Sequence, residues 1–164
     1  MNELFNNSCF ITETIYNTNM IEKIEIKFVK THQNALLPTK AYDGDNCYDI
    51  YAVEGVIVPA KGSAVVQVGL TVGYITPGFG FVIKSRSGLS FKNDIQAHAG
   101  EIDNGYRGDM GVKLYNHNDI DYTVNRGDRV AQFKVEKVWL TTLSFIDEII
   151  PADRGSQGRG SSGQ

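Results

Sequence analysis

Short β-prone runs between turn signals are the feature of this sequence that most limits what it can fold into. Runs such as "CYDIYAV", "SAVVQVGL", "TVGYI" and "RVAQFKVEKV" are rich in β-branched and aromatic residues. Pairs such as Pro77-Gly78 and Asn104-Gly105 separate such runs. Frequent short strands favour an all-β sandwich or barrel over an alternating α/β fold. Only "SGLSFKN" at 87–93 could form a short helix.

The length of 164 residues is enough for one hydrophobic core, and we expect one domain. Alternation of apolar and charged residues from Ile24 to Phe28 predicts a half-buried first strand. Residues 1–19 contain five asparagines and no lysine or arginine, and we interpret them as an N-terminal extension that need not be ordered. The β-barrel domain is then expected over 20–150, and a flexible Gly/Ser/Arg tail over 151–164.

Charge and hydropathy exclude several classes of partner. The formal net charge of -3 does not suit a broad basic surface, so no nucleic-acid partner is expected. The chain shows no basic leader and no apolar run of about 18 residues, so we expect no membrane partner. The expected location is intracellular and soluble, in the cytoplasm or in a host's cytoplasm if the protein is viral. Cys9 and Cys47 have no zinc-type spacing with a histidine.

The stretch "PGFGFVIKSRSGLS" (77–90) contains a candidate anion site. Ser87 is placed to be the N-cap of the short helix, where free backbone amides attract an anion. Gly88 lets the backbone approach a ligand closely, and Arg86 adds a forked cationic donor. The residues indicate a phosphate site, although an ordinary capped turn with a surface arginine has the same sequence.

The stretch "HAGEIDNGYRGD" (98–109) contains a candidate general base. Asp103 precedes the turn signal Asn104-Gly105 and could accept a proton from water if it stays ionised. Tyr106 could stack on a base or a sugar. A turn aspartate and a core tyrosine are the simpler interpretation of the same residues.

Two further polar residues lie in predicted strands. Asp49 falls within the apolar run "YDIYA", where a carboxylate needs a partner or a metal-bound water. Gln132 alternates with Ala131 and Phe133, which places it on the polar face of its strand. A solvated strand position would explain Gln132 equally well.

Five stretches of the chain resemble the signature motifs of the homotrimeric dUTPase family (deoxyuridine 5′-triphosphate nucleotidohydrolases), and they follow one another in the order of that family's motifs. The matching stretches are "DNCYDIYA", "PGFGFVIKSRSGLS", "GEIDNGYRGD", "RGDRVAQF" and "RGSQGRGSSG", and the resemblance covers about residues 20–164. It implies a jelly-roll-like β-barrel with one short helix and a homotrimer. Each active site would take its first, second and fourth motifs from one subunit, the third from another and the tail from the last.

The activity implied by the resemblance is Mg²⁺-dependent hydrolysis of dUTP to dUMP and pyrophosphate. Asp103 would activate the water that attacks the α-phosphorus, Tyr106 would pack on the deoxyribose, and Asp49 would hold a water of the Mg²⁺ ion. The backbone around Ile95, Ala99, Gly100 and Ile102 would recognise uracil. The remaining contacts, to phosphate and to the covered nucleotide, would come from Arg86, Ser87, Gly88, Gln132, Arg154, Arg159, Gly160, Ser161 and Ser162.

The tail departs from the family pattern at Arg159, which stands where the family usually has phenylalanine. Its planar guanidinium could stack on uracil or reach for phosphate. We expect the tail to become ordered only over bound nucleotide.

Two alternatives to a dUTPase remain open at this stage. A dCTP deaminase shares the fold, but the resemblance places Lys113 where that family has its catalytic glutamate. A nucleotide-binding trimer without catalytic activity would retain the phosphate motif, although Asp103, Arg86 and Arg154 argue against it.

Overall fold

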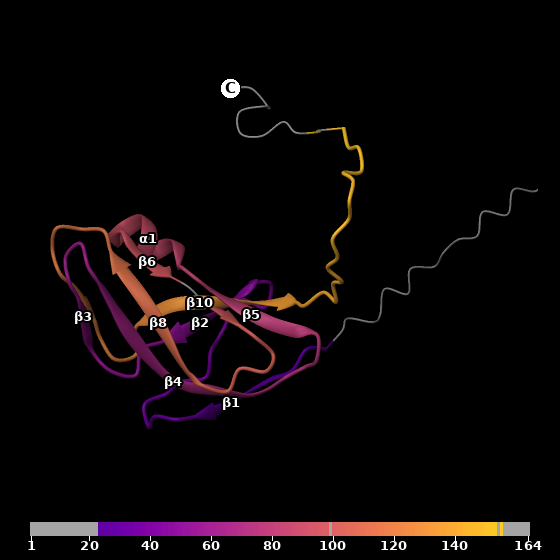
Figure 1. The fold of residues 1–164 in the computed structure, drawn as a ribbon. Helices are drawn as coiled ribbons and strands as arrows, with labels where there is room; N and C mark the ends of the chain where they lie inside the picture. The colour runs from indigo at the N-terminus through magenta and orange to yellow at the C-terminus, as the bar shows by residue number, and fades with distance from the viewer. Residues whose placement is uncertain (1–22, 99, 154, 156–164) are drawn as a thin grey trace, which may run out of the picture.

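The computed structural model of the chain describes residues 23–98, 100–153 and 155, and its strands form three antiparallel sheets (Figure 1). One sheet has four strands in the order β1 (Ile26–Lys30), β4 (Ser63–Ile75), β8 (Asp109–Asn116) and β6 (Ile95–His98). A second has the order β2 (Cys47–Tyr51), β10 (Arg129–Lys137), β5 (Phe79–Lys84) and β7 (Glu101–Ile102). The third pairs β3 (Val56–Val58) with β9 (Tyr122–Val124).

The expectation of an all-β fold with one short helix is confirmed. The helix α1 (Ser87–Asn93) has the predicted bounds. The described strands are divided among three sheets and are not closed into one continuous barrel sheet. The predicted extension at 1–19 and nearly all of the tail beyond Asp153 lie outside the described residues.

The two runs predicted at 63–70 and 71–75 form a single strand, β4, with an irregularity in the middle. The pairing with β8 shifts between Gln67 and Thr71. Gly69 lies inside this shift with a positive φ of 63°, and a Cβ there would lie 2.6 Å from the Cβ of His32. A glycine in the left-handed region therefore lets the strand bend without ending.

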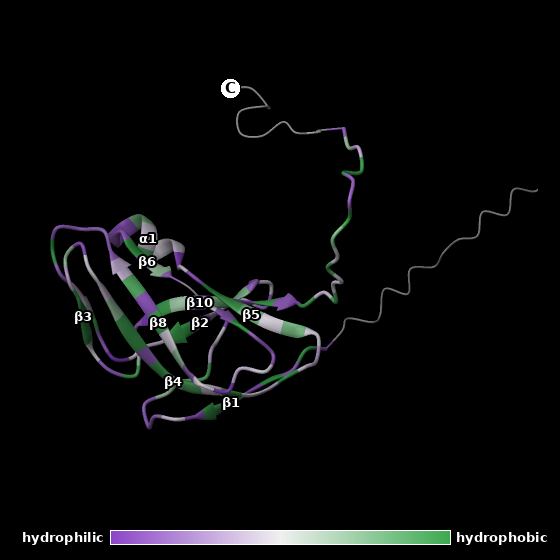
Figure 2. Ribbon diagram, viewed as in Figure 1, coloured by the Kyte–Doolittle hydropathy of each residue, from purple (hydrophilic) through white to green (hydrophobic). Residues whose placement is uncertain are grey.

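The core lies between the two larger sheets and is formed by alternate residues of their strands. Phe81 and Phe133 are almost fully buried, and their ring centroids are 4.4 Å apart. Tyr48 stacks on Phe133 at 5.1 Å, and Phe28 of β1 packs against both phenylalanines, as the half-buried first strand requires. This cluster joins β1, β2, β5 and β10. Figure 2 shows apolar residues along these strands and also along the segment after β10.

The segment after β10 extends away from the sheets without regular secondary structure (Figure 1). Its apolar side chains are exposed, among them Trp139 (73%), Leu140 (103%) and Phe145 (106%). No helix within the described part of the chain has the length and apolar character needed to cross a membrane.

Asn116 is the only fully buried polar residue among those that the structure describes. Its Nδ2 donates to the carbonyls of Val58 (3.0 Å) and Ile120 (2.7 Å), and its Oδ1 accepts from the amide of Asn118 (3.0 Å). The side chain thereby ties β8 to β3 and to the loop before β9.

Asn116→Leu is expected to lower the free energy of unfolding by about 2–4 kcal/mol, because it leaves two carbonyls and one amide without their partner in a buried place. Chemical denaturation of the purified protein measures the loss. Gln67→Leu, at an exposed position of β4, serves as the control and should change the free energy by less than about 0.5 kcal/mol. Equal effects of the two substitutions would contradict this role of Asn116.

Candidate active site

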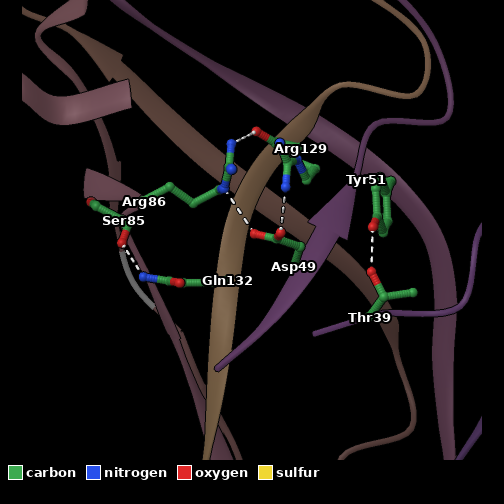
Figure 3. A network of polar contacts seen from close by, with 7 residues as sticks. All are labelled: Thr39, Asp49, Tyr51, Ser85, Arg86, Arg129 and Gln132. Carbon is green, nitrogen blue, oxygen red and sulfur yellow. Dashed lines mark hydrogen bonds and ion pairs between the residues drawn. The ribbon is translucent and has the colours of Figure 1, made fainter. Parts of the chain in front are cut away.

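A carboxylate, that of Asp49, lies between two arginines (Figure 3). Asp49 lies on β2, and its side chain is only 15% exposed. Arg86 Nε donates to Asp49 Oδ1 at 2.8 Å, and Arg129 Nη1 donates to Asp49 Oδ2 at 3.2 Å. Arg86 Nη1 also donates to the carbonyl of Arg129 at 2.9 Å. The partner that an acid in this apolar strand needs is thus a pair of guanidinium groups.

Arg86 occupies the N-cap of α1, a position that the sequence analysis wrongly gave to Ser87. Arg86 has an extended backbone (φ −90°, ψ 131°), and its carbonyl accepts from the amides of Leu89 and Ser90. Ser87 is therefore the first residue of the helix, and the cap has no side-chain hydrogen bond. The shift by one residue leaves Arg86 at the junction of β5 and α1, where its side chain can reach Asp49.

Gln132 lies beside this cluster and is not simply a solvated strand residue. It is partly buried on β10, where it pairs with Asp49 on one side and with Lys84 on the other. Its Nε2 donates to the carbonyl of Ser85 at 2.8 Å (Figure 3). The register of β10 therefore brings the first, second and fourth motifs together in one chain.

The surface next to Arg86 is open. Ser87 and Gly88 are exposed, and a Cβ added at Gly88 would meet no atom within 4 Å. The exposed backbone of these two residues leaves space for a ligand beside the Arg86 guanidinium.

Asp103 lies at the other end of β5. It follows β7, which pairs Ile102 with Phe81. A Cβ on Gly80 would lie 2.8 Å from the Ile102 carbonyl oxygen and 3.9 Å from the Asp103 Cα. From Gly80 to Arg86 the chain is extended, which separates Asp103 from Arg86 by about 20 Å within one chain.

The Asp103 side chain is exposed, and its carboxylate has no hydrogen bond or ion pair with any other described residue. Its backbone carbonyl accepts from the amide of Tyr106 at 3.0 Å. The two candidate carboxylates thus differ in their ion pairing: Asp49 is paired with two arginines, whereas Asp103 has no ion pair among the described residues.

Tyr106 is 41% exposed, and its hydroxyl donates to the carbonyl of Asp109 at 2.9 Å. The ring lies over Gly108, where a Cβ would be 2.5 Å from the Tyr106 hydroxyl oxygen. Tyr106 is therefore a surface residue held in place by its own loop and is not a core tyrosine.

The segment from Ile95 to Ile102, to which the resemblance assigns the recognition of uracil, is divided between two sheets. β6 pairs with β8 in one sheet and β7 pairs with β5 in another, so the segment crosses between the sheets. The side chains of Ile95 and Ile102 are buried in the core, and Gly100 is half-buried with its carbonyl accepting from Ile83. Six predicted residues lie outside the described part of the chain: Ala99, Arg154, Arg159, Gly160, Ser161 and Ser162.

Sequence reasoning missed Arg129 and Tyr122. Arg129 was visible only as the second arginine of "RGDRVAQF", and its contact with Asp49 spans eighty residues of sequence. Burial and the charge of Asp128 raise the pKa of the Tyr122 phenol, whereas the charge of Arg86 lowers it. No pattern in the sequence pointed to this influence of Arg86 on Tyr122.

Within the described residues, no three histidine, cysteine, aspartate or glutamate side chains gather closely enough to hold a metal ion. Asp49 is the carboxylate nearest to the arginines, and both of its oxygens already accept hydrogen bonds.

Comparison with known proteins places these features in a family. The dUTPase family model matches residues 33–163. A relative from Dictyostelium discoideum, a mitochondrial deoxyuridine 5′-triphosphate nucleotidohydrolase, is 39% identical over 137 residues, which are 84% of this chain and 76% of that protein.

Solved dUTPase structures from bacteriophages resemble the fold. A dUTPase variant of Staphylococcus bacteriophage 80alpha with dUpNHpp superposes with a TM-score of 0.75 at 25% identity, over 87% of this chain and 99% of that one. A variant dUTPase from phage phi11 of S. aureus, described with a coordinated structural Mg(II) ion, superposes with a TM-score of 0.70 at 25% identity, over 76% of this chain and 97% of that one.

Proposed function

The chain belongs to the dUTPase family and hydrolyses dUTP to dUMP, and we propose that it does so at a site built from Asp49, Arg86 and Asp103. The observation that carries this assignment is the contrast between the two carboxylates. Asp49 is ion-paired with two arginines, whereas Asp103 is exposed and has no partner among the described residues. Of these two carboxylates, only Asp103 is therefore available to accept a proton.

In the proposed reaction, Asp103 accepts a proton from the water that attacks the α-phosphorus. The bond from the α-phosphorus to its bridging oxygen breaks, and pyrophosphate leaves as dUMP forms. Arg86 uses Nε and one Nη1 hydrogen inside the protein, so its remaining N–H groups can face the phosphates. Gln132, Ser87 and Gly88 complete the phosphate side, and Arg154, Arg159, Gly160, Ser161 and Ser162 close over the nucleotide.

The residues fit a Mg²⁺ ion that takes most of its ligands from the substrate. Mg²⁺ in phosphate sites is commonly held by one or two carboxylates, waters and phosphate oxygens. Asp49 would hold it through a water molecule, and the bound ion would neutralise phosphate charge. Because Asp49 is already paired with arginines, we expect Mg²⁺ to bind weakly before the triphosphate does.

We assign the nucleoside end of the substrate to Tyr106 and to the crossover between the sheets. Tyr106 would lie against the deoxyribose and leave no space for a 2′-hydroxyl. The backbone around Ala99 and Gly100 would recognise uracil, with Ile95 and Ile102 fixing it to the core. Ser85 Oγ already bonds both the amide (2.9 Å) and the carbonyl (3.1 Å) of Ala97, which keeps this part of the segment rigid.

A homotrimer would unite groups that one chain keeps apart. A general base must lie within hydrogen-bond reach of its water beside the α-phosphorus, but Asp103 and Arg86 are separated by about 20 Å in one subunit. The exposed apolar side chains after β10, such as Trp139, Leu140 and Phe145, also need a covering surface. In a homotrimer, a second copy of the chain would bring its Asp103 to the phosphate site of the first. Another copy would also cover the exposed apolar side chains after β10.

Complementation between inactive subunits tests this arrangement. Asp103→Asn and Arg86→Lys chains carrying different tags are co-expressed, and trimers that contain both are isolated through the two tags. At a dUTP concentration well below KM, each variant alone should be nearly inactive. The isolated mixed trimers should regain one of their three sites, about a third, because a site with both intact residues draws them from different subunits. The shared site would be contradicted if the mixed trimers were no more active than the single variants. It would also be contradicted if light scattering showed that the active enzyme is strictly monomeric.

A further inference from the structure

The loop that carries Asp103 is held by hydrogen bonds at most of its residues, whereas the Asp103 carboxylate has no hydrogen-bond partner among the described residues. It connects β7 with β8 over residues 103–108, and β7 is an edge strand of only two residues. A strand of two residues is too short to determine by itself where the side chain of the next residue, Asp103, points. Other contacts must therefore determine where the Asp103 carboxylate lies.

Asn104 makes the most extended of these contacts. Its Nδ2 lies within hydrogen-bond distance of three main-chain carbonyls, those of Phe79 (2.9 Å), Thr76 (3.0 Å) and Ile75 (3.2 Å), so that one of its two hydrogens is shared between two of them. These carbonyls belong to the end of β4, the connecting loop and the start of β5, so one side chain ties the Asp103 loop to the junction of both large sheets.

On its outer side the same loop is held by Arg107. Its Nη1 donates to the carbonyls of Asn104 and Tyr106, both at 2.7 Å. Gly80 closes the inner side, where a Cβ would collide with the Ile102 carbonyl. Asn104 alone among these residues joins the loop to both sheets through its side chain.

We infer that Asn104 is a positioning residue for the reaction, which holds the Asp103 carboxylate where a neighbouring subunit's substrate and water can meet it. This inference rests on the proposed role of Asp103. The amide of Asn104 does not face the substrate, since its donors are directed at the three carbonyls. Its effect should therefore fall on kcat and depend on the presence of Asp103.

Asn104→Ala is expected to lower kcat for dUTP about tenfold and to change KM less than about twofold, because a displaced base slows proton transfer without weakening phosphate contacts. Asn104→Ser keeps one donor and should lose less. Asn34→Ala is the matched control, since Asn34 Nδ2 also donates to a main-chain carbonyl, that of Val53 at 3.1 Å, but away from the proposed site. Its kcat should equal that of the unmodified enzyme.

The decisive comparison repeats Asn104→Ala in an Asp103→Asn background, with trimer content and melting temperature measured for every variant. If Asn104 acts through Asp103, the second substitution leaves the residual kcat unchanged. An equal tenfold loss in both backgrounds would overturn the inference and show a general structural role. Near-normal kcat of Asp103→Asn by itself would instead contradict the proposed function of Asp103.

Discussion

Asp103→Asn is expected to bind dUTP almost normally and to lower kcat about 10³-fold, within the 10²–10⁴-fold range that a general base contributes. The amide has nearly the shape of the carboxylate but cannot accept a proton from water. Because the Asp103 carboxylate has no hydrogen bond or ion pair with another described residue, its replacement should not disturb the fold. Steady-state kinetics of pyrophosphate release and calorimetric titration with a non-hydrolysable dUTP analogue measure the two quantities separately.

Asp119→Asn is the control for this substitution. Asp119 is also an exposed loop aspartate, and its carboxylate pairs with Lys61 at 3.2 Å, outside the proposed site. Its kcat should be unchanged. A kcat for Asp103→Asn within a factor of about three of the control would remove Asp103 from the role of base.

Arg86→Lys is the second substitution with a large expected effect, a fall in kcat/KM for dUTP of about 10²-fold, mostly through KM. Arg86 serves three partners in the proposed complex: the Asp49 carboxylate, the Arg129 carbonyl and the substrate phosphates. A lysine keeps the charge but has no planar fork, so it cannot serve these partners together. Asp49 would also retain only Arg129, whose side chain is more exposed and more distant.

Arg126→Lys provides the matched control, because Arg126 lies in the turn before β10 and outside the cluster of Figure 3. The same kinetic assay should give an unchanged kcat/KM. If Arg86→Lys is also unchanged, the charge of residue 86 suffices and the forked geometry has no role in binding phosphate.

Local patterns in the sequence predicted the elements of the fold well. The bounds of α1 and the strand character of β2, β5 and β10 follow from turn residues and alternation, which depend on near neighbours only. The need of Asp49 for a partner was also predictable, because an acid inside an apolar strand cannot remain unpaired. The error at Ser87 has a local cause: Arg86 keeps an extended backbone, so the helix begins one residue after the cap.

Features that depend on register could not be predicted from the sequence. Arg129 meets Asp49 only because β10 pairs with β2, and the continuous β4 depends on how Gly69 packs against His32. The separation of Asp103 from Arg86 arises because Asp103, which follows β7, lies beside Gly80 near the start of β5, while Arg86 follows the end of β5. These long-range pairings support the shared site that the resemblance to the dUTPase family implied.

The central claim is that the chain hydrolyses dUTP to dUMP, and a substrate panel tests it most directly. The purified protein is incubated with Mg²⁺ and with dUTP, dCTP, UTP or dTTP, while pyrophosphate and ammonia are measured in parallel. The account predicts pyrophosphate from dUTP, little or none from the other nucleotides, and no ammonia. Ammonia from dCTP, or binding of dUTP without pyrophosphate release, would contradict it.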